Sequence, residues 1–393
     1  MTPAARIAAA IEVLDLVIAA ARGQGAPADR LLAEWLRQRR FAGSKDRRAI
    51  RELVYAAIRA CGPVPASGRA AMLRLAKVQP ELTALFDGST YGPAPIVAGE
   101  PVAIGGVAPE WLTGRLVSAG IEGAEAEALL ERAPLDIRVN ALKASRSALE
   151  LPEQGEPLPS PQGLRLPAGT PVEQWDAYAQ GLIEVQDGGS QLVCEAVAAR
   201  SGQIVIDLCA GAGGKTLALA AMMENGGTLI AADTDRARLS RLSPRADRAG
   251  AKVDHVVLLN PGQELAGLQP WVGQADAVLV DAPCSGTGTW RRNPEARWRL
   301  TTAELERLVA LQARLLVLAA QLVKPGGRLV YVTCSLLDEE GADQVATFLA
   351  AQPGWSAQEV ELPRGTARGV GLRLTPHADG TDGFFVARLG KRW

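Results

Sequence analysis

Two cysteines in the second half of the chain each follow a short apolar run that is typical of a buried strand. Residues 277–280 lead into the motif DAPCSGTG at 281–288, and residues 328–332 lead into TCS at 333–335. The carboxyl ends of neighbouring parallel strands meet at one edge of a sheet, so we expect Cys284 and Cys334 to lie together beside Asp281. A single such cysteine is usually buried and inert. Two of them beside a carboxylate favour nucleophilic chemistry on a carbon that must be activated before it reacts.

A glycine-rich loop, CAGAGGKT at 209–216, follows the apolar run at 204–208. A nucleoside-triphosphate P-loop would need glycine where Cys209 stands, so that site is disfavoured. A Rossmann-like first turn that holds a nucleoside cofactor fits better, because glycines allow close approach and the next helix offers N–H groups. Asp233 ends the following strand, where an acid can bind ribose hydroxyls. A dinucleotide and S-adenosylmethionine both fit this pattern.

The elements that must position these groups alternate from about residue 193 onward. This alternation predicts an α/β fold with a doubly wound, mostly parallel sheet and helices on both faces. The expected strands are 204–208, 228–232, 253–259, 277–280, 328–332 and 384–389. A helix through Leu308, Leu315 and Leu322 is expected to stop at the Lys-Pro-Gly-Gly run 324–327.

Residues 1–132 read as an all-α domain in which apolar residues recur at helical spacing. Ser44 is the expected N-cap of the third helix. Residues 1–80 carry 14 Lys/Arg and 6 Asp/Glu, a net charge of +8, whereas the whole chain has −1. Such asymmetry suggests a polyanion-binding module, although a basic solvated helix surface would look the same. Six arginines between Arg37 and Arg51 favour a phosphate-facing patch.

Residues 133–192 form a third region of different character. Residues 135–140 and 181–186 read as strands, and a stretch rich in proline and glycine at 152–171 separates them. We therefore predict a small α+β linker subdomain at 133–192, between the helical domain and a catalytic domain at 193–393.

The composition narrows the remaining classes. The five cysteines form no CxxC pair and the chain has only two histidines, so we expect no metal site. The apolar N-terminal stretch contains Glu12 and Asp15, which a signal peptide would not have. No run is long enough to span a bilayer. These features predict a cytoplasmic protein that is not bound to a membrane, and we expect a monomer.

Taken together, these motifs resemble the RsmB/NOP/NSUN family of RNA cytosine-5 methyltransferases. The matches lie at 207–216, 281–288 and 333–335, with support from Arg138-Val139-Asn140, Gln186-Asp187, the RRNP run at 291–294 and DGFF at 382–385. They extend from about residue 135 to the C-terminus and are specific as a set. The N-terminal helices resemble the NusB-type RNA-binding domain of the RsmB-like branch.

The resemblance implies a Rossmann-like class I methyltransferase domain and the following roles. Cys334 is the nucleophile that adds to carbon 6 of cytosine, Cys284 assists product release, and Asp281 contacts the base and stabilises the adduct. Lys215 belongs to the same site. The implied cofactor is S-adenosylmethionine, bound by Cys209, Ala210, Gly211, Ala212, Gly213, Gly214, Lys215, Asp233, Asn260 and Asp281. The implied substrate is RNA, with small-subunit ribosomal RNA as the family-based expectation.

The predicted RNA-binding residues are arginines at two places in the chain: Arg37, Arg39, Arg40, Arg47, Arg48, Arg291 and Arg292. Trp290 and Trp298 flank the second group, where they could stack on bases or pack in a core. The target base must be unpaired or flipped out to reach two thiols in a cleft.

Two positions depart from the family pattern. Ala212 stands where many members have proline, which we expect only to loosen the turn. Asn260 stands where the third strand usually ends in an aspartate near the adenine. Since asparagine offers both an acceptor and donors, we expect altered adenine contact rather than lost binding.

Other functions remain open at this stage. An RNA-binding protein with a degenerate methyltransferase domain would not need both cysteines and Asp281. A Rossmann dehydrogenase leaves the paired thiols unexplained. A methyltransferase acting on transfer RNA, protein or adenine is a third possibility, although adenine enzymes carry a different strand-end motif from Asp-Ala-Pro-Cys.

Overall fold

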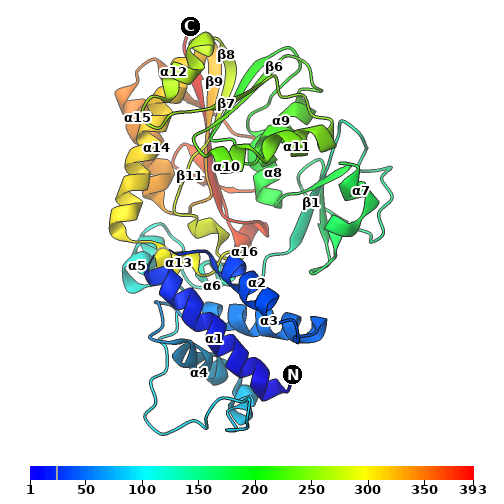
Figure 1. The fold of residues 1–393 in the computed structure, drawn as a ribbon. Coiled ribbons are helices and arrows are strands. Elements are labelled where there is room, and N and C mark those ends of the chain that lie inside the picture. The colour runs from blue at the N-terminus through cyan, green and yellow to red at the C-terminus, as the bar shows by residue number, and fades with distance from the viewer. Residues whose placement is uncertain (24) are drawn as a thin grey trace. The chain divides into compact units, whose positions relative to one another are not determined.

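The computed structural model describes residues 1–23 and 25–393, which divide into two compact units (Figure 1). The helical unit comprises Met1–Glu131 and Thr289–Thr301, and the sheet unit comprises Arg132–Gly288 and Thr302–Trp393. The sequence predicted three contiguous domains divided at 132/133 and 192/193. The structure differs in that the two later regions cluster as one unit, and in that residues 289–301 belong with the N-terminal helices.

The helical unit is built around α1, whose buried face includes Ile7, Leu14 and Ile18. Helices α3 and α4 pack on α1 and bury further aliphatic residues against it. The helices and the 3-10 turn of this unit are α1 (Pro3–Arg22), α2 (Ala28–Gln38), α3 (Ser44–Ala60), α4 (Gly68–Val78), η1 (Pro80–Leu85), α5 (Glu110–Ser118), α6 (Ala124–Ala128) and α13 (Ala296–Arg299). The amphipathic spacing read from the sequence therefore yields a helical core.

The predicted N-cap of α3 is wrong by one residue. Gly43 occupies the cap position without a side-chain hydrogen bond, and Ser44 is the first helical residue. Ile50, Val54 and Ile58 are buried on the inner face of α3. Packing of that apolar face stabilises α3 without the side-chain cap, which would contribute about 1 kcal/mol.

The sheet unit contains a nine-stranded sheet with a parallel core. Its order is β11-β12-β13-β9-β8-β5-β6-β7, with β10 paired to β13. The strands are β5 (Ile204–Leu208), β6 (Thr228–Asp233), β7 (His255–Leu258), β8 (Ala275–Asp281), β9 (Val323–Thr333), β10 (Trp355–Gln358), β11 (Thr366–Arg368), β12 (Gly371–Leu374) and β13 (Phe384–Lys391). Strands β7, β6, β5, β8 and β9 are parallel, whereas the pairs of β13, β12, β11 and β10 are antiparallel.

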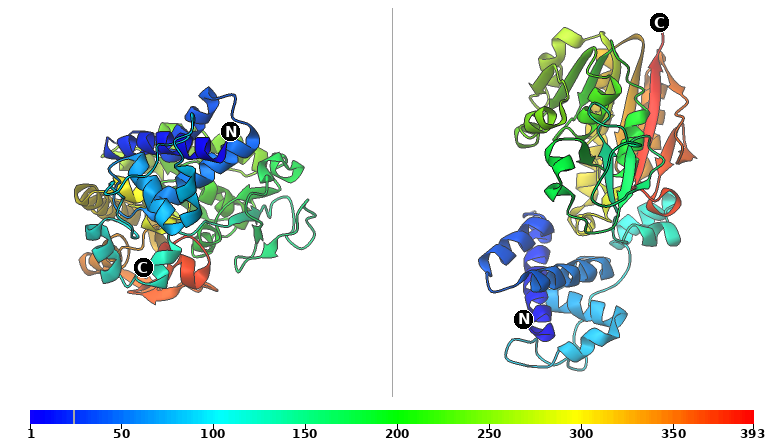
Figure 2. Two further views of the ribbon diagram at one scale, coloured as in Figure 1. Left: turned by 90° about the horizontal axis from the view of Figure 1, so that it is seen from below. Right: turned by 90° about the vertical axis from the view of Figure 1, so that its right-hand side faces the viewer.

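Helices cover both faces of this sheet, as Figures 1 and 2 show. The α-helices are α8 (Gly188–Glu195), α9 (Gly214–Met222), α10 (Arg236–Leu239), α11 (Leu242–Ala249), α12 (Glu264–Leu268), α14 (Thr302–Leu322), α15 (Ala342–Ala351) and α16 (Pro376–Asp379). The short 3-10 turns are η3 (Gln269–Trp271), η4 (Thr287–Thr289) and η5 (Asp338–Glu340). Val278 and Val280 of β8 share a buried cluster with α14 and α15, whereas Ala277 and Leu279 share one with α8 and α9. This alternation buries the central strand on both faces.

A second, antiparallel sheet of order β2-β3-β1-β4 occupies the region predicted as a linker subdomain. Its elements are β1 (Leu135–Val139), β2 (Glu156–Pro157), β3 (Gly163–Leu166), η2 (Val172–Gln174), α7 (Asp176–Ala179) and β4 (Ile183–Val185). β1 and β4 correspond to the predicted strands. β2 and β3 lie inside the stretch that proline and glycine made look like a plain connection. They pair with each other, and β3 also pairs with the distant β1.

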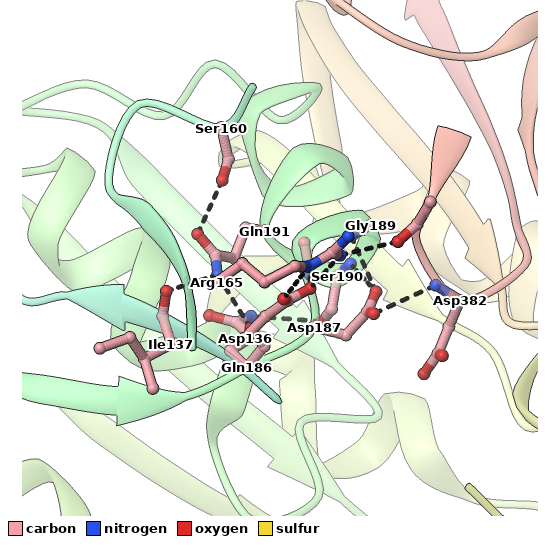
Figure 3. Close-up of polar contacts among 12 residues, drawn as sticks. Asp136, Ile137, Ser160, Arg165, Gln186, Asp187, Gly189, Ser190, Gln191 and Asp382 are labelled. Atoms are coloured by element: carbon pink, nitrogen blue, oxygen red, sulfur yellow. Dashed lines mark hydrogen bonds and ion pairs between the residues drawn. The ribbon is translucent and has the colours of Figure 1, made fainter. Parts of the chain in front are cut away.

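Figure 3 shows the polar contacts that tie this small sheet to the rest of the unit. Asp136 accepts hydrogen bonds from the Arg165 guanidinium at 2.8 and 3.0 Å and from the Gly188 N–H at 3.0 Å. Asp187 caps α8 and also accepts the Asp382 N–H at 3.1 Å. Asp187 and Asp382, which belong to supporting motifs of the family resemblance, thus make a contact between the segments that follow β4 and precede β13.

Candidate active site

The two strand-end cysteines lie side by side. β8 and β9 are adjacent and parallel, with Asp281 opposite Val332. Cys284 lies three residues beyond β8, and Cys334 lies one residue beyond β9. Their Sγ atoms are 3.3 Å apart. Both thiols are partly exposed and free. The topology therefore places two thiols at one point above the carboxyl edge of the sheet, as the sequence predicted.

The loop that carries Cys284 is locked at its far end by backbone contacts. The Gly288 N–H donates to the Cys334 carbonyl at 3.0 Å, and the Gly383 N–H donates to the Gly288 carbonyl at 2.8 Å. A Cβ added at Gly288 would stand 2.2 Å from the Gly383 carbonyl oxygen, so only glycine fits this crossing. The DGFF motif at the C-terminus thereby contributes to the position of the cysteine loop.

Lys215 and Asp281 form an ion pair between α9 and the end of β8. Lys215 Nζ lies 2.7 Å from Asp281 Oδ2, and both side chains are largely shielded from solvent. Burial alone would lower the pKa of Lys215, but the Asp281 carboxylate outweighs it and raises that pKa above its usual value. Lys215 is therefore held as a cation that orients Asp281.

The glycine-rich loop forms a tight turn before α9. Cys209, Gly211 and Gly213 all have positive φ, and Gly213 is the N-cap of α9. The left-handed conformation at Cys209 is uncommon outside glycine and marks a strained turn. The Cys209 and Ala210 N–H groups both donate to the Ala232 carbonyl of β6. This geometry brings the backbone of the loop across the carboxyl ends of β5 and β6.

The acidic and amide side chains predicted to meet the cofactor lie at the ends of β6 and β7. Asp233 is buried, and its carboxylate accepts the Gly211 N–H and the Asp235 N–H, each at 2.7 Å. Asn260 lies two residues beyond β7 with an exposed side chain. Asp233 is thus joined to the glycine-rich loop, while Asn260 contributes an open amide near the same edge.

The sequence analysis missed a role for Asp207, the buried carboxyl at the end of β5. Thr216 Oγ1 donates to Asp207 Oδ2 at 2.6 Å, and Oδ1 has no hydrogen-bond partner among the described residues. Burial raises the pKa of Asp207 to about 7, although the Thr216 bond opposes that rise. If the Asp207 carboxyl is protonated, it is uncharged, and its buried Oδ1 needs no counter-ion.

The raised pKa makes Asp207 a source of pH-dependent stability. The folded state keeps its proton up to about pH 7, whereas an unfolded Asp loses it near pH 4. This contribution is complete below pH 4 and falls by about 1.4 kcal/mol per pH unit as the pH rises to about 7. Asp207→Asn is expected to remove that slope, so the decrease in unfolding free energy between pH 5 and pH 8 should be smaller in the variant by roughly 2–3 kcal/mol. Urea unfolding at both pH values measures it, and an unchanged slope in the variant would refute the assignment.

The surroundings of Cys284 favour the protonated form of its thiol. The hydrogen bond with Cys334, together with burial, raises the pKa of Cys284 well above that of an ordinary cysteine. Cys284 is therefore a weaker acid than an ordinary cysteine thiol.

The aromatic and basic residues after the cysteine loop pack in the helical unit. Trp298 is part of its core and donates from Nε1 to the Gly62 carbonyl at 3.1 Å, and Trp290 is fully buried. Core packing is therefore the better account of both tryptophans. Arg291 is 6% exposed, which argues against its predicted contact with RNA, whereas Arg292 is half-buried.

The N-terminal arginines predicted to face RNA differ in their surroundings. Arg37 pairs with Glu34, and Arg39 pairs with Glu12 and lies 3.9 Å from the Trp35 ring centre. Arg47 donates to the Ala42 carbonyl. Arg40 and Arg48 are exposed. Their contact with RNA stays a prediction, and the exposed arginines of this group are Arg37, Arg40 and Arg48.

The sheet order, the glycine-rich turn and the acidic strand ends together define a methyltransferase of the Rossmann-like class. Residues 195–390 match the family model described as 16S rRNA methyltransferase RsmB/F. The probable ribosomal RNA small subunit methyltransferase B of Synechocystis sp. is 36% identical over 299 residues, which is 72% of this chain and 66% of that protein. The Salmonella paratyphi B enzyme of that name gives the same identity and coverage over 294 residues. The chain belongs to the RsmB/F methyltransferase family.

Solved structures agree with this placement. PH0851 is 27% identical and superposes with a TM-score of 0.73 over 100% of this chain and 99% of its own. A methyltransferase homolog protein from Pyrococcus horikoshii is also 27% identical, with a TM-score of 0.60 over 72% of this chain and 99% of its own. NSun6 from Pyrococcus horikoshii, at 21% identity and a TM-score of 0.60, shares the fold. The chain aligns with 66% of the length of the curated relatives, slightly less than two thirds.

Two further features of the molecule bear on partners. Across residues 1–23 and 25–393, no helix combines the length and hydropathy needed to cross a bilayer. Within the same residues, no group of three or more His, Cys, Asp or Glu side chains is arranged to hold a metal ion.

Proposed function

We propose that the protein transfers a methyl group from S-adenosylmethionine to carbon 5 of a cytosine in RNA. The observation that carries the proposal is the pair of thiols 3.3 Å apart beside the Lys215–Asp281 ion pair. The chemistry of a Rossmann dehydrogenase does not require the pair of thiols. A protein that only binds RNA does not require the thiols, Lys215 and Asp281 together.

The electrostatics of the glycine-rich turn favour a cationic cofactor. Burial raises the pKa of Cys209 well above its ordinary value, and the carboxylates of Asp233 and Asp281 add to that rise. A site surrounded by carboxylates suits the sulfonium and ammonium groups of S-adenosylmethionine and disfavours the pyrophosphate of a dinucleotide. Asp233 offers its carboxylate to ribose hydroxyls, the loop from Cys209 to Lys215 lines the site, and Asn260 is available to the adenine. When bound, this cofactor supplies the methyl group.

The roles of the side chains follow from their positions. Cys334 adds to carbon 6 of the cytosine, which makes carbon 5 nucleophilic, while Asp281 holds the base at its N3 edge and Lys215 orients Asp281. After methylation, carbon 5 gives up its proton and the electron pair of that bond forms the carbon 5–carbon 6 double bond. The carbon 6–sulfur bond breaks, and its electron pair returns to Cys334. Cys284 assists this proton loss and the departure of Cys334.

The proposed substrate is small-subunit ribosomal RNA, because the curated relatives are named as methyltransferases of that subunit. A cytoplasmic setting and a monomeric state remain predictions, as does the NusB-like role of the helices. The test is transfer of a labelled methyl group from S-adenosylmethionine to small-subunit RNA, followed by nucleoside analysis. Label in 5-methylcytidine supports the proposal. Label in a methylated adenosine, or in protein, would contradict it.

A further inference from the structure

A fully buried carboxylate lies beneath the loop that carries Cys284. Glu340, in η5, is six residues beyond Cys334 and has no exposed surface. Its Oε1 accepts the Ser285 N–H at 2.8 Å, and its Oε2 accepts the Ser285 hydroxyl. The residue that follows Cys284 is therefore fastened to Glu340 through both backbone and side chain.

Gln312 of α14 extends this contact to the other side of Cys284. Its Nε2 donates to Glu340 Oε1 and to the Pro283 carbonyl, both at 2.9 Å. Pro283 and Ser285, which flank Cys284, are thus both held by the Glu340–Gln312 pair.

Glu340 is also joined to the strand that carries the second thiol. Its backbone carbonyl accepts the Tyr331 hydroxyl at 2.9 Å and the Thr333 hydroxyl at 3.3 Å. Thr333 directly precedes Cys334. One residue therefore contacts the flanks of both thiols, with its side chain on the Cys284 loop and its backbone on β9.

A carboxyl group at position 340 is not needed merely to hold the two loops together. Its side-chain partners are neutral donors, a hydroxyl, an amide and a backbone N–H, rather than a cation. Burying a carboxylate without a cation costs stability, and a buried glutamine could make part of the same contacts without that cost. A carboxyl group buried among neutral donors is characteristic of a functional site.

We propose that Glu340 is a positioning residue for product release: it holds Cys284 against Cys334 through the residues that flank Cys284. The inference rests on the release role proposed for Cys284 and adds the residue that controls it. The titratable groups that act on Cys284 are Cys334, Glu340 and Tyr331. Cys334 and Glu340 both raise the pKa of Cys284, Cys334 more strongly.

The test uses Glu340→Gln in the full-length protein under single-turnover conditions with RNA and S-adenosylmethionine. The covalent protein–RNA adduct is followed on denaturing gels, which separates its formation from its decay. Formation is expected within about threefold of wild type, and decay is expected to slow by about 10- to 100-fold because Cys284 is displaced. The pH midpoint of decay should also fall, since a negative charge no longer opposes ionisation of Cys284.

The pH profile distinguishes the proposal from a purely structural role, which would slow decay at every pH without moving the midpoint. Glu340→Asp should restore part of the decay rate and return the midpoint toward wild type. Glu306→Gln makes the same chemical change at an exposed site on α14 and should match wild type. If Glu340→Gln does not fold, Ser285→Ala removes only the hydroxyl contact and should slow decay by a smaller factor.

Two failures can be told apart. If Cys284→Ala traps no adduct, the proposed release role fails, and this inference falls with it. The other failure requires that Cys284→Ala traps adduct. If Glu340→Gln then releases product at the wild-type rate and with the wild-type pH midpoint, only the role of Glu340 is overturned. The same follows if Ser285→Ala, used in its place, releases product at the wild-type rate.

Discussion

Cys334→Ala is expected to leave a folded protein that no longer methylates RNA, with the rate reduced on the order of 10⁴-fold or more. The reason is geometric: Cys284 Sγ lies 3.3 Å from Cys334 Sγ, on a loop fixed by its own contacts, so Cys284 cannot take the place of Cys334. Transfer of labelled methyl groups to RNA measures the effect.

Cys284→Ala is expected to give the opposite phenotype. The adduct forms because Cys334 is intact, but it accumulates because the group that assists release is absent. Denaturing gels should show RNA bound to Cys284→Ala and none bound to the double variant that also lacks Cys334. Cys61→Ala is the matched control, since Cys61 is buried in the helical unit, and it should match wild type in both assays. Full activity in Cys334→Ala would contradict the mechanism.

Arg297→Met is expected to destabilise the helical unit by roughly 3–5 kcal/mol. The Arg297 guanidinium has no exposed surface and donates to the carbonyls of Ile58 and Cys61 at 2.7 and 2.8 Å, and to that of Pro294. Methionine fills a similar volume but leaves these buried acceptors unpaired, at about 1–3 kcal/mol each. Thermal and denaturant unfolding measure the loss.

Arg48→Met is the matched control for this prediction. Arg48 is exposed on α3, so its substitution should change the unfolding free energy by no more than about 0.5 kcal/mol. If Arg48 faces RNA as the sequence predicted, the control should instead weaken RNA binding and reduce its salt dependence. An unfolding free energy of Arg297→Met equal to that of Arg48→Met would show that residues 289–301 are not an integral part of the helical unit.

The contacts of residues 289–301 explain why this segment belongs with the helices. Glu295 Oε1 accepts the Ala28 N–H at the start of α2, and Arg299 donates to the carbonyls of Gly25 and Ala26. Trp298 completes the core. The partners of these side chains lie more than 230 residues earlier in the chain. No local pattern in the sequence encodes such pairs. For that reason Arg291 and Arg292, in the same segment, were predicted to lie on a surface that binds RNA.

The parallel part of the fold could be predicted because its signals are local. β6, β8 and β9 contain apolar runs and end in Asp or Thr, β5 ends in Leu208 directly before Cys209, and alternation with helices implies a shared carboxyl edge. The meeting of Cys284 with Cys334 follows from that topology alone. β10, β11 and β12 were missed because they are short strands of the antiparallel edge, where pairing with β13 rather than composition defines them.

Within the site, the residues missed by sequence reasoning are those that act through others. Glu340 lies in an acidic run, Asp338-Glu339-Glu340, that resembles an exposed turn. Its burial depends on Ser285 and Gln312, which reach it from different elements. The position of this run shortly after Cys334 was the one available signal, and it does not tell which acid turns inward.

Bisulfite sequencing of ribosomal RNA tests the central claim most directly. RNA from cells that express the wild-type protein should contain at least one small-subunit cytosine protected from conversion. That protection should vanish in cells that lack the protein or carry Cys334→Ala, and it should return when the wild-type protein is restored. If every cytosine in the small-subunit RNA converts equally in all these cells, the protein does not make 5-methylcytosine in that RNA, and the account of its function is contradicted.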